Sequence, residues 1–371
     1  MGYSIMMRDS LQAADPEDIF SPDQVLSDLD SRGRERDWKG KKMRNELLAE
    51  AYEGINPKKS ARLRECGKVL TYRIYEDGTK KLDSMNSCRV RLCPICTWRR
   101  SLKIFSQTKQ IVERIAADYG YQYIMLTLTI KSCEGADLAA ILDRILQAWN
   151  RLLQLKEVKS MCKGWYRSLE IVHDISPFIT RDMWHGNPEK HIRSRKAYYE
   201  ARGLKIGDEN PAYDKFHPHI HALIAVQPSY FSSRYYIKQQ RWSELWGDCL
   251  RVDYSPRVDV RRVRGATMDD LCKAVAEVAK YAAKDSDYII PDDWELTCDT
   301  VRILDSALDS RRLVAYGGIM RIVKAAMKLD DAESSTADLV RVDDDEKSPD
   351  LPYKLISYWW YSGFRQYYSC D

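Results

Sequence analysis

The middle of the chain carries two patterns of hydrophobic and polar residues. Four segments alternate every second residue and are rich in β-branched and aromatic side chains, which is typical of strands with one buried face. These predicted strands are residues 121–130, 164–174, 216–226 and 256–263. Apolar residues recur at helical spacing in three further segments. These predicted helices are residues 136–158, 232–250 and 268–284. The order β-α-β-β-α-β-α favours an antiparallel α+β sheet of the split βαβ, ferredoxin or RRM-like type, with the third strand central.

The flanking segments are less regular. Residues 37–52 and 98–115 have helical periodicity, and residues 311–328 fit a short strand followed by a helix. The prolines and mixed charges of 175–215 indicate an insertion in a hairpin connection. We therefore expect four consecutive parts. They are an N-terminal arm with a helix (1–60), a cysteine-bearing basic module (61–105), the α/β domain (106–295) and a C-terminal region with an acidic, flexible loop and an aromatic end (296–371).

Composition narrows the class of protein. Hydrophobic residues make up 44% of the 371 residues, enough for a buried core. No apolar run approaches the roughly 20 residues that span a bilayer, and the N-terminus has no apolar stretch typical of a secretory signal, so we expect a cytoplasmic protein without a membrane partner. In that reducing compartment the ten cysteines are expected to bind metal or lie buried. The net charge of +4 is unevenly spread, with basic residues in 89–103 and 257–264 and acidic residues in 330–350, which suits a protein that holds DNA in one place.

Three histidines occupy alternate positions of one predicted strand: His217, His219 and His221. Side chains two apart in a strand share a face, so the three imidazoles project together. Neutral imidazoles clustered in this way suit a divalent metal, and a solvated polar face is the alternative. Glu170 lies between apolar residues of the preceding strand, where an acid is costly unless it is paired or bound to an ion. We predict that Glu170 is the third metal ligand, with an exposed acid on the polar face as the alternative.

A second group of polar side chains lies in the predicted helix 268–284. Glu277, Tyr281 and Lys284 are spaced four and three residues apart, so they share a helix face and are expected to converge. Glutamate and lysine at this spacing usually form a solvated face, and a tyrosine among them usually packs. The group gains functional meaning from the metal-binding strand predicted in the same domain.

Four cysteines precede the α/β domain: Cys66, Cys88, Cys93 and Cys96. The last two form a C-x-x-C pair, and four thiolates complete a tetrahedral zinc site. A redox-active pair and buried core thiols are the alternatives. Zinc would stabilise this core-poor segment by roughly 10 kcal/mol or more. Such a module is expected to present basic side chains to DNA phosphates. They are Arg89, Arg91, Arg99, Arg100 and Lys103.

Five motifs carry a likeness to a known family. They are CRVRLCPICTWRRSLK (88–103), MLTLTI (125–130), HPHIHAL (217–223), EVAKYAAKDSDY (277–288) and RLVAYGGI (312–319). In this order they resemble the rolling-circle plasmid replication initiators of the HUH endonuclease superfamily, in the branch with a single catalytic tyrosine. The histidine-hydrophobe-histidine unit of the metal motif is His219-Ile220-His221. The likeness covers roughly residues 35–368, and the long stretch 175–215 departs from the family pattern.

The resemblance implies an HUH endonuclease fold, preceded by a small zinc-binding module, in an enzyme that nicks one strand of a plasmid origin. His219, His221 and Glu170 would then hold Mg²⁺ or Mn²⁺, and Tyr281 would attack the phosphodiester, leaving a 5′-phosphotyrosine and a free 3′-OH. Lys284 would clamp a phosphate, and His217 would support the ligands or be a further one. The implied partners are origin DNA, recognised as a duplex and nicked in a single-stranded or cruciform segment, a host helicase and a DNA polymerase.

Glu277 stands one helical turn before Tyr281, where relatives with two tyrosines carry the second one. A carboxylate beside a phosphate can activate water, so we expect termination by Glu277-assisted hydrolysis, with Tyr288 as the rival second nucleophile. A relaxase or transposase of the same superfamily is an alternative function, and a non-enzymatic zinc-dependent DNA-binding regulator is an alternative from another class. The aromatic run 358–361 fits packing, or stacking on single-stranded bases.

Overall fold

The computed structural model describes residues 20–30, 32–189, 192–263, 268–279, 283–290, 292–342 and 351–369. The chain divides into two compact units: unit 1 comprises Met1–Glu113 and Val323–Asp371, and unit 2 comprises Arg114–Ile322. This division differs from the four consecutive parts predicted from the sequence, because the cysteine-bearing segment and the C-terminal strands belong to the same unit. No helix among the described residues is long and apolar enough to cross a membrane.

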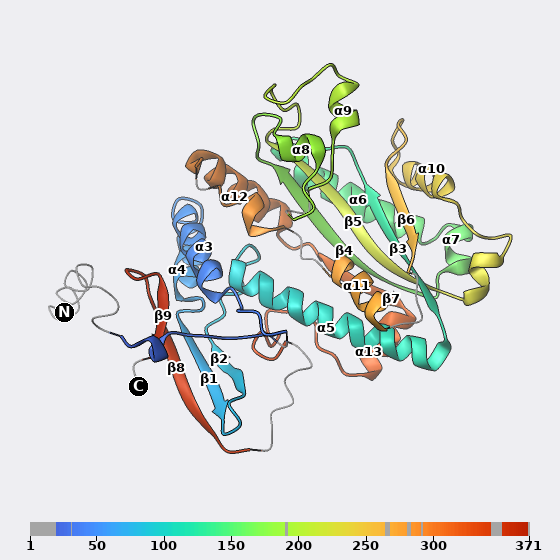
Figure 1. Ribbon diagram of the computed structural model, residues 1–371. Coiled ribbons are helices and arrows are strands. Elements are labelled where there is room, and N and C mark those ends of the chain that lie inside the picture. The colour runs from blue at the N-terminus through green and yellow to red at the C-terminus, as the bar shows by residue number, and fades with distance from the viewer. Residues whose placement is uncertain are drawn as a thin grey trace. The chain divides into compact units, whose positions relative to one another are not determined.

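Unit 2 is built on a five-stranded sheet in which every neighbouring pair is antiparallel. The strands are β3 (Gln122–Thr129), β4 (Gly164–Asp174), β5 (Lys215–Val226), β6 (Val258–Arg262) and β7 (Val314–Gly318). Their spatial order is β6-β3-β5-β4-β7 (Figure 1). The first four strands of unit 2, β3 to β6, therefore lie in the order 4-1-3-2, the split βαβ arrangement, and β7 adds an edge strand beside β4. The predicted α+β architecture, with the histidine strand central, is confirmed.

Helices cover both faces of this sheet. They are η2 (Gly135–Asp137), α6 (Leu138–Leu152), α7 (Lys156–Met161), η3 (Pro228–Ser232), α10 (Gln239–Leu250), α11 (Met268–Val278), η4 (Asp285–Asp287) and α12 (Trp294–Leu308). Leu138, Leu142, Ile145 and Trp149 are fully buried along α6, which packs on β5 and against α10 and α12. The predicted helix 136–158 is thus two helices, and α12 was not predicted. α11 contacts β5 on the opposite face.

The predicted helix 268–284 is shorter than expected. α11 ends at Val278, and Lys284 has an extended backbone just before η4. The hydroxyl of Ser168 donates a hydrogen bond of 2.6 Å to the carbonyl oxygen of Val278, which in a longer helix would accept from the backbone four residues on. Lys284 therefore does not lie on the helix that carries Glu277, which corrects that part of the prediction.

The insertion in the β4–β5 hairpin leaves the strand pairing intact. Asp174 and Lys215 are paired at its two ends, and two short helices, α8 (Arg181–His185) and α9 (Lys196–Glu200), lie beyond them at that end of the hairpin (Figure 1). Ile179, Met183 and Tyr199 form a small core of its own within the insertion. The predicted hairpin insertion is confirmed, and it does not move β4 relative to β5.

Unit 1 contains a four-stranded antiparallel sheet in the order β2-β1-β8-β9. Its elements are η1 (Pro22–Gln24), α3 (Trp38–Ala51), α4 (Pro57–Glu65), β1 (Val69–Tyr75), β2 (Lys80–Met85), β8 (Tyr353–Tyr361) and β9 (Gln366–Ser369), with α5 (Pro94–Tyr119) beginning in this unit and α13 (Ile319–Ala326) ending in it. The aromatic run lies on β8: Tyr358 and Trp360 are buried, whereas Trp359 is 45% exposed. Packing therefore accounts for alternate residues of this run.

Candidate metal centres

Glu170, His219 and His221 converge at the centre of the unit 2 sheet. The Nε2 atoms of His219 and His221 lie 3.0 and 2.8 Å from the same carboxylate oxygen, Oε2 of Glu170. Glu170, His219 and His221 are only 6%, 9% and 6% exposed. The solvated polar face considered as the alternative is therefore not what these three residues form.

Strand register brings the three side chains together. Glu170 on β4 lies directly opposite His219 on β5, and His221 lies opposite Ser168 on β4 and Thr127 on β3. Cross-strand partners point to the same face of a sheet, so the alternation of β5 aims its histidines at the face that carries α11. The residues between them enter the core on the other face.

The surrounding hydrogen bonds prepare these groups as ligands. Burial raises the pKa of the Glu170 carboxyl, but the hydrogen bonds from His219 and His221 outweigh burial and hold this pKa well below its ordinary value. Nδ1 of His221 lies 3.2 Å from Oγ1 of Thr127, and Nδ1 of His219 lies 3.2 Å from the carbonyl oxygen of His217. A proton on Nδ1 of His219 suits that carbonyl, and a bound cation would replace the Nε2 proton that His219 donates to Glu170. One carboxylate oxygen and two ring nitrogens, all within 4.8 Å of one another, fit a divalent cation.

His217 stands apart from this cluster. Its ring centroid lies 5.6 Å from that of His219, and its Nδ1 lies 3.4 Å from Oγ of Ser132. Burial, together with the charges of His219, Arg195 and Arg257, lowers the pKa of His217 to about 4, so the ring is neutral at pH 7. This position suits a supporting residue better than a ligand.

Asp287 is a further carboxyl near the cluster that the sequence analysis did not single out, although it belongs to the motif 277–288. Burial and the charge of Glu170 raise the pKa of Asp287 to about 6. Its carbonyl oxygen lies 3.0 Å from Nδ1 of His173, a residue of β4. A second acid whose charge acts on Glu170 strengthens the negative potential that favours a cation.

Of the predicted group Glu277, Tyr281 and Lys284, the structure describes the first and the last. Tyr281 lies outside the described residues, Glu277 is half-buried in the last turn of α11, and Lys284 is exposed. The contact between Ser168 and the carbonyl of Val278 places the end of α11 beside the strand position opposite His221. Tyr288, the rival nucleophile, is 1% exposed and therefore packs in the core.

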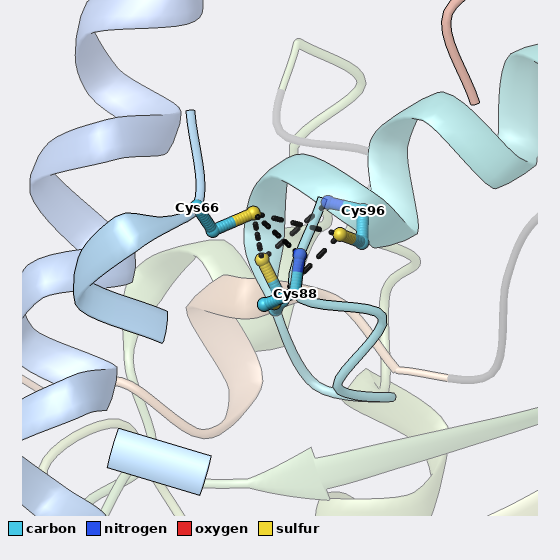
Figure 2. A group of neighbouring side chains, drawn as sticks. Cys66, Cys88 and Cys96 are labelled. Carbon is cyan, nitrogen blue, oxygen red and sulfur yellow. Dashed lines mark hydrogen bonds between the residues drawn. The ribbon is translucent and has the colours of Figure 1, made fainter. Parts of the chain in front are cut away.

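The four predicted cysteines meet in unit 1. Cys66 follows α4, Cys88 lies in the loop before α5, and Cys93 and Cys96 lie at the start of α5, with the four sulfur atoms within 4.8 Å of one another. Figure 2 shows the side chains of Cys66, Cys88 and Cys96 pointing toward one another. The Sγ–Sγ distances are 3.5 Å for Cys66–Cys93, 3.6 Å for Cys66–Cys96 and 3.7 Å for Cys88–Cys96. These lengths are far above a disulfide bond of about 2 Å, and four buried thiols at this spacing fit a tetrahedral zinc ion.

Polar groups around the sulfur atoms also suit thiolates. The backbone N–H of Cys88 donates to Sγ of Cys66 at 3.4 Å, and that of Arg89 donates to Sγ of Cys96 at 3.4 Å. The side-chain amide of Asn45 donates to Sγ of Cys93 at 3.2 Å. Hydrogen-bond donors directed at sulfur stabilise the negative charge that zinc-bound thiolates carry.

The basic side chains that follow the cysteines are engaged inside unit 1. Arg99, Arg100 and Lys103 are 0%, 3% and 6% exposed. Nε of Arg99 donates to the carbonyl oxygen of Leu339 at 2.8 Å, and Nζ of Lys103 lies 2.6 Å from Oδ2 of Asp330. The predicted exposed DNA surface is therefore wrong for these three residues, because they are buried: Arg99 and Lys103 bond the segment after α13, and Arg100 donates to the carbonyl oxygen of Arg89.

The two remaining basic residues contact the same segment. Nη1 of Arg89 donates to the carbonyl oxygen of Ala337 at 2.7 Å, and Nη1 of Arg91 lies 3.5 Å from Oε1 of Glu333. The part of the expected acidic, flexible loop that is described, up to Val342, is thus fastened by arginines, and its residues 343–350 lie outside the described residues.

Comparison with known proteins identifies the family to which the chain belongs. A family model described as "Replication protein" matches residues 79–368, which include both histidines, Glu170 and the tyrosine motif. The chain belongs to the replication protein family. The resemblance drawn from the motifs, to plasmid rolling-circle replication initiators, is confirmed.

Individual relatives of this replication protein cover nearly the whole chain. A "Protein rep" of Bacillus amyloliquefaciens is 34% identical over 370 residues, covering 92% of this chain and 96% of the relative. A "Protein rep" of Lactiplantibacillus plantarum is 31% identical over 87% of this chain and 91% of the relative. A "Protein rep" of Streptococcus pneumoniae serotype 2 is 30% identical over 91% of this chain and 93% of the relative. No solved structure matches the chain significantly. The likeness supports a plasmid replication initiator.

Proposed function

We propose that this initiator nicks one strand of its plasmid origin, with Tyr281 as nucleophile and a divalent cation held by Glu170, His219 and His221. The observation that carries the proposal is the convergence of two imidazole nitrogens on one buried carboxylate oxygen in adjacent central strands. Tyr281 comes three residues after Val278 in the sequence. The carbonyl oxygen of Val278 accepts a hydrogen bond from Ser168, the strand partner of His221. That position supports Tyr281 as the attacking group.

The proposed step is a transesterification. The phenolic oxygen of Tyr281 forms a bond to phosphorus while the bond from phosphorus to the 3′ oxygen breaks, and a proton ends on that oxygen to give a 3′-OH. Bound Mg²⁺ or Mn²⁺ supplies Lewis-acid polarisation of the phosphoryl oxygens. A phenol with an unperturbed pKa of about 10 is ionised in roughly one molecule in a thousand at pH 7, so a nearby positive charge speeds attack. Lys284, exposed after α11, is the proposed phosphate clamp.

Glu277 is the proposed general base for termination. It lies in the last turn of α11, half-buried, four residues before Tyr281. A carboxylate in this position can take a proton from water as the water attacks the second phosphodiester. The round of replication then ends by hydrolysis instead of by transfer to a second tyrosine, a role for which the buried Tyr288 is unsuited.

The proposed cofactors are Mg²⁺ or Mn²⁺ at the nicking site and structural Zn²⁺ at the four cysteines. The proposed partners are origin DNA, recognised as a duplex and cut in a single-stranded or cruciform segment, with a host helicase and a DNA polymerase acting after the nick. Relaxase or transposase chemistry would use the same centre, but the replication protein family favours the plasmid origin as substrate.

Relaxation of a supercoiled plasmid that carries the cognate origin tests the proposal. We expect relaxation with Mn²⁺, loss of relaxation after chelation with EDTA, and recovery when Mn²⁺ is added back. Tyr281→Phe should bind the origin and fail to relax it, whereas the matched control Tyr288→Phe should relax it normally. Mass spectrometry should find the 5′-phosphate on Tyr281. A protein that binds the origin and leaves the plasmid supercoiled under all these conditions would instead be a DNA-binding regulator.

Glu277→Gln separates termination from initiation. We expect the variant to cut the origin once at the wild-type rate and to accumulate covalent protein–DNA complex, because the hydrolytic step lacks its base. Glu244→Gln, on the exposed surface of α10, is a matched control. Normal termination by Glu277→Gln would overturn this assignment and leave the nicking proposal standing.

A further inference from the structure

A hollow of about 480 Å³ lies in unit 2 where β4 begins and β7 ends, and none of the roles assigned above uses it. Its volume is within the roughly 300–1,000 Å³ typical of ligand sites. Gly164, in the wall of the hollow, lies six residues before Glu170 on β4. At about 3.3 Å per strand residue, the hollow is roughly 20 Å from the Glu170 end of the metal cluster. We refer to it as the β4–β7 hollow.

The charge of the β4–β7 hollow is positive. Lys159, Lys163 and Arg321 line it, and none of its lining residues, all of which are described, is acidic. Lys159 and Arg321 are exposed and Lys163 is half-buried. Three cations that share one concave surface repel each other until an anion joins them, and a phosphate group is the anion that such a set attracts.

An aromatic ring forms part of the wall. Trp165 lines the hollow and is partly exposed. It packs against Trp149, with ring centroids 5.3 Å apart. An aromatic ring fixed in this way beside cations can bind the bases of single-stranded nucleic acid while the cations bind its phosphates.

Two glycines let the walls of the hollow approach each other closely. A Cβ added to Gly317 would lie 2.2 Å from the ring of Trp165. Gly318 has a φ of +56°, and a Cβ there would lie 2.5 Å from the carbonyl oxygen of Lys163. Only residues without a side chain let β7 come this close to the start of β4, so the shape of the hollow depends on both glycines.

We propose that the β4–β7 hollow binds a nucleotide of the single-stranded DNA that flanks the nick. Its phosphate lies among Lys159, Lys163 and Arg321, and its base stacks on Trp165. The identity of the strand as origin DNA rests on the proposed nicking function, whereas the binding chemistry does not. A free nucleotide offers the same chemistry, and the experiment separates the two sources.

The first test measures binding of fluorescein-labelled dT15 to the full chain by anisotropy across a range of salt concentrations. The triple variant Lys159→Ala, Lys163→Ala, Arg321→Ala should bind at least tenfold more weakly, and its plot of log Kd against log salt should be less steep by about 2, from roughly 0.7 per lost contact. The matched triple variant removes three exposed cations elsewhere in unit 2 and should change Kd less than twofold. It is Arg144→Ala, Lys205→Ala, Arg302→Ala. Equal losses in the two variants would overturn the proposal.

Two further arms identify the ligand. Trp165→Leu should weaken dT15 binding at least fivefold and leave the salt dependence unchanged, because stacking carries no charge. Photocrosslinking of a 5-iododeoxyuridine oligonucleotide should label Trp165, as read by mass spectrometry, and absence of label on Trp165 would overturn the stacking arrangement. Free dTMP should compete at least a hundredfold less well than dT15 on a molar basis. Competition by dTMP as strong as that of dT15 would make the hollow a site for free nucleotides and overturn the strand proposal.

Failure here and failure of the nicking function give different results. If wild-type protein binds dT15 through the hollow and never relaxes origin plasmid, the nicking function fails alone. If wild-type protein nicks an origin oligonucleotide and the triple hollow variant has the same KM and kcat, the hollow proposal fails alone. A raised KM with an unchanged kcat is the expected result, because the hollow holds DNA far from the reacting phosphate.

Discussion

Arg99 provides a test of whether the basic segment after the cysteines supports the fold or contacts DNA. The side chain is 0% exposed. Its Nε donates to the carbonyl oxygen of Leu339, and its Nη2 donates to that of Val340. The guanidinium also lies 5.7 and 5.5 Å from the ring centroids of Trp38 and Trp98. We therefore expect Arg99→Met to act through the stability of unit 1.

The magnitude follows from the two carbonyl groups. Methionine keeps much of the volume but donates no hydrogen bond, so the buried carbonyl of Leu339 and the half-buried carbonyl of Val340 lose a charged donor, at a cost of roughly 1–3 kcal/mol each. The expected loss is about 2–6 kcal/mol, a large part of the roughly 5–15 kcal/mol by which domains are stable. Arg91 is the matched control, because its side chain is 30% exposed and its contact with Glu333 is 3.5 Å long. Such a pair contributes about 1 kcal/mol or less.

Urea unfolding followed by tryptophan fluorescence measures the loss, and hydrogen exchange of residues 330–342 locates it. Arg99→Met should unfold at clearly lower urea than Arg91→Met, with faster exchange in this segment. DNA affinity measured well below the unfolding midpoint should stay near that of wild type. A variant with wild-type stability and exchange but weakened DNA binding would show that Arg99 faces DNA, and the structural role argued here would be wrong.

Three further predictions concern the zinc site, the β4–β7 hollow and the acid near the metal cluster. Cys93→Ser should lower the zinc content below about one ion per chain and lower the melting temperature, as read by metal analysis and calorimetry, whereas Cys298→Ser, a single half-buried thiol, should change neither. Gly317→Ala should destabilise the protein by about 1–3 kcal/mol in urea unfolding, because its Cβ would lie 2.2 Å from the ring of Trp165, and an unchanged midpoint would refute the close approach. The pKa of Asp287 is raised to about 6, so the folded state favours the protonated carboxyl and loses stability as pH rises from about 4 to 6. Without added Mg²⁺ or Mn²⁺, Asp287→Asn should therefore be more stable than wild type by up to about 3 kcal/mol at pH 8 and equal to it near pH 3.5.

The metal cluster was readable from the sequence because strand geometry is local. Two-residue alternation puts His219 and His221 on one face without knowledge of any other part of the fold. Glu170 stood out because a charged residue between apolar neighbours needs a partner. The long insertion departs from the family pattern, yet the residues at its two ends, Asp174 and Lys215, are paired, so its length has no effect on the register.

Features that depend on distant partners were not readable. β1 pairs with β8, so Val69 lies opposite Trp359, a residue far away in the sequence. No periodicity within either strand identifies the other strand as its partner. The end of α11 was missed for a similar reason, because the hydroxyl of Ser168 on another strand bonds the carbonyl of Val278. The local sequence there has neither the glycine nor the proline that usually stops a helix.

The uneven charge of the chain illustrates the same limit and changes where DNA contacts should be sought. The basic run 89–103 and the acidic segment after residue 329 were interpreted as a DNA-facing front and a separate tail. In unit 1 they neutralise each other, with Lys103 against Asp330 and Arg91 against Glu333. Cations already bonded to carboxylates and carbonyl groups release few counterions when DNA arrives. Phosphate binding therefore depends on cations that face solvent without an acidic neighbour in their wall, which is the condition that the β4–β7 hollow meets.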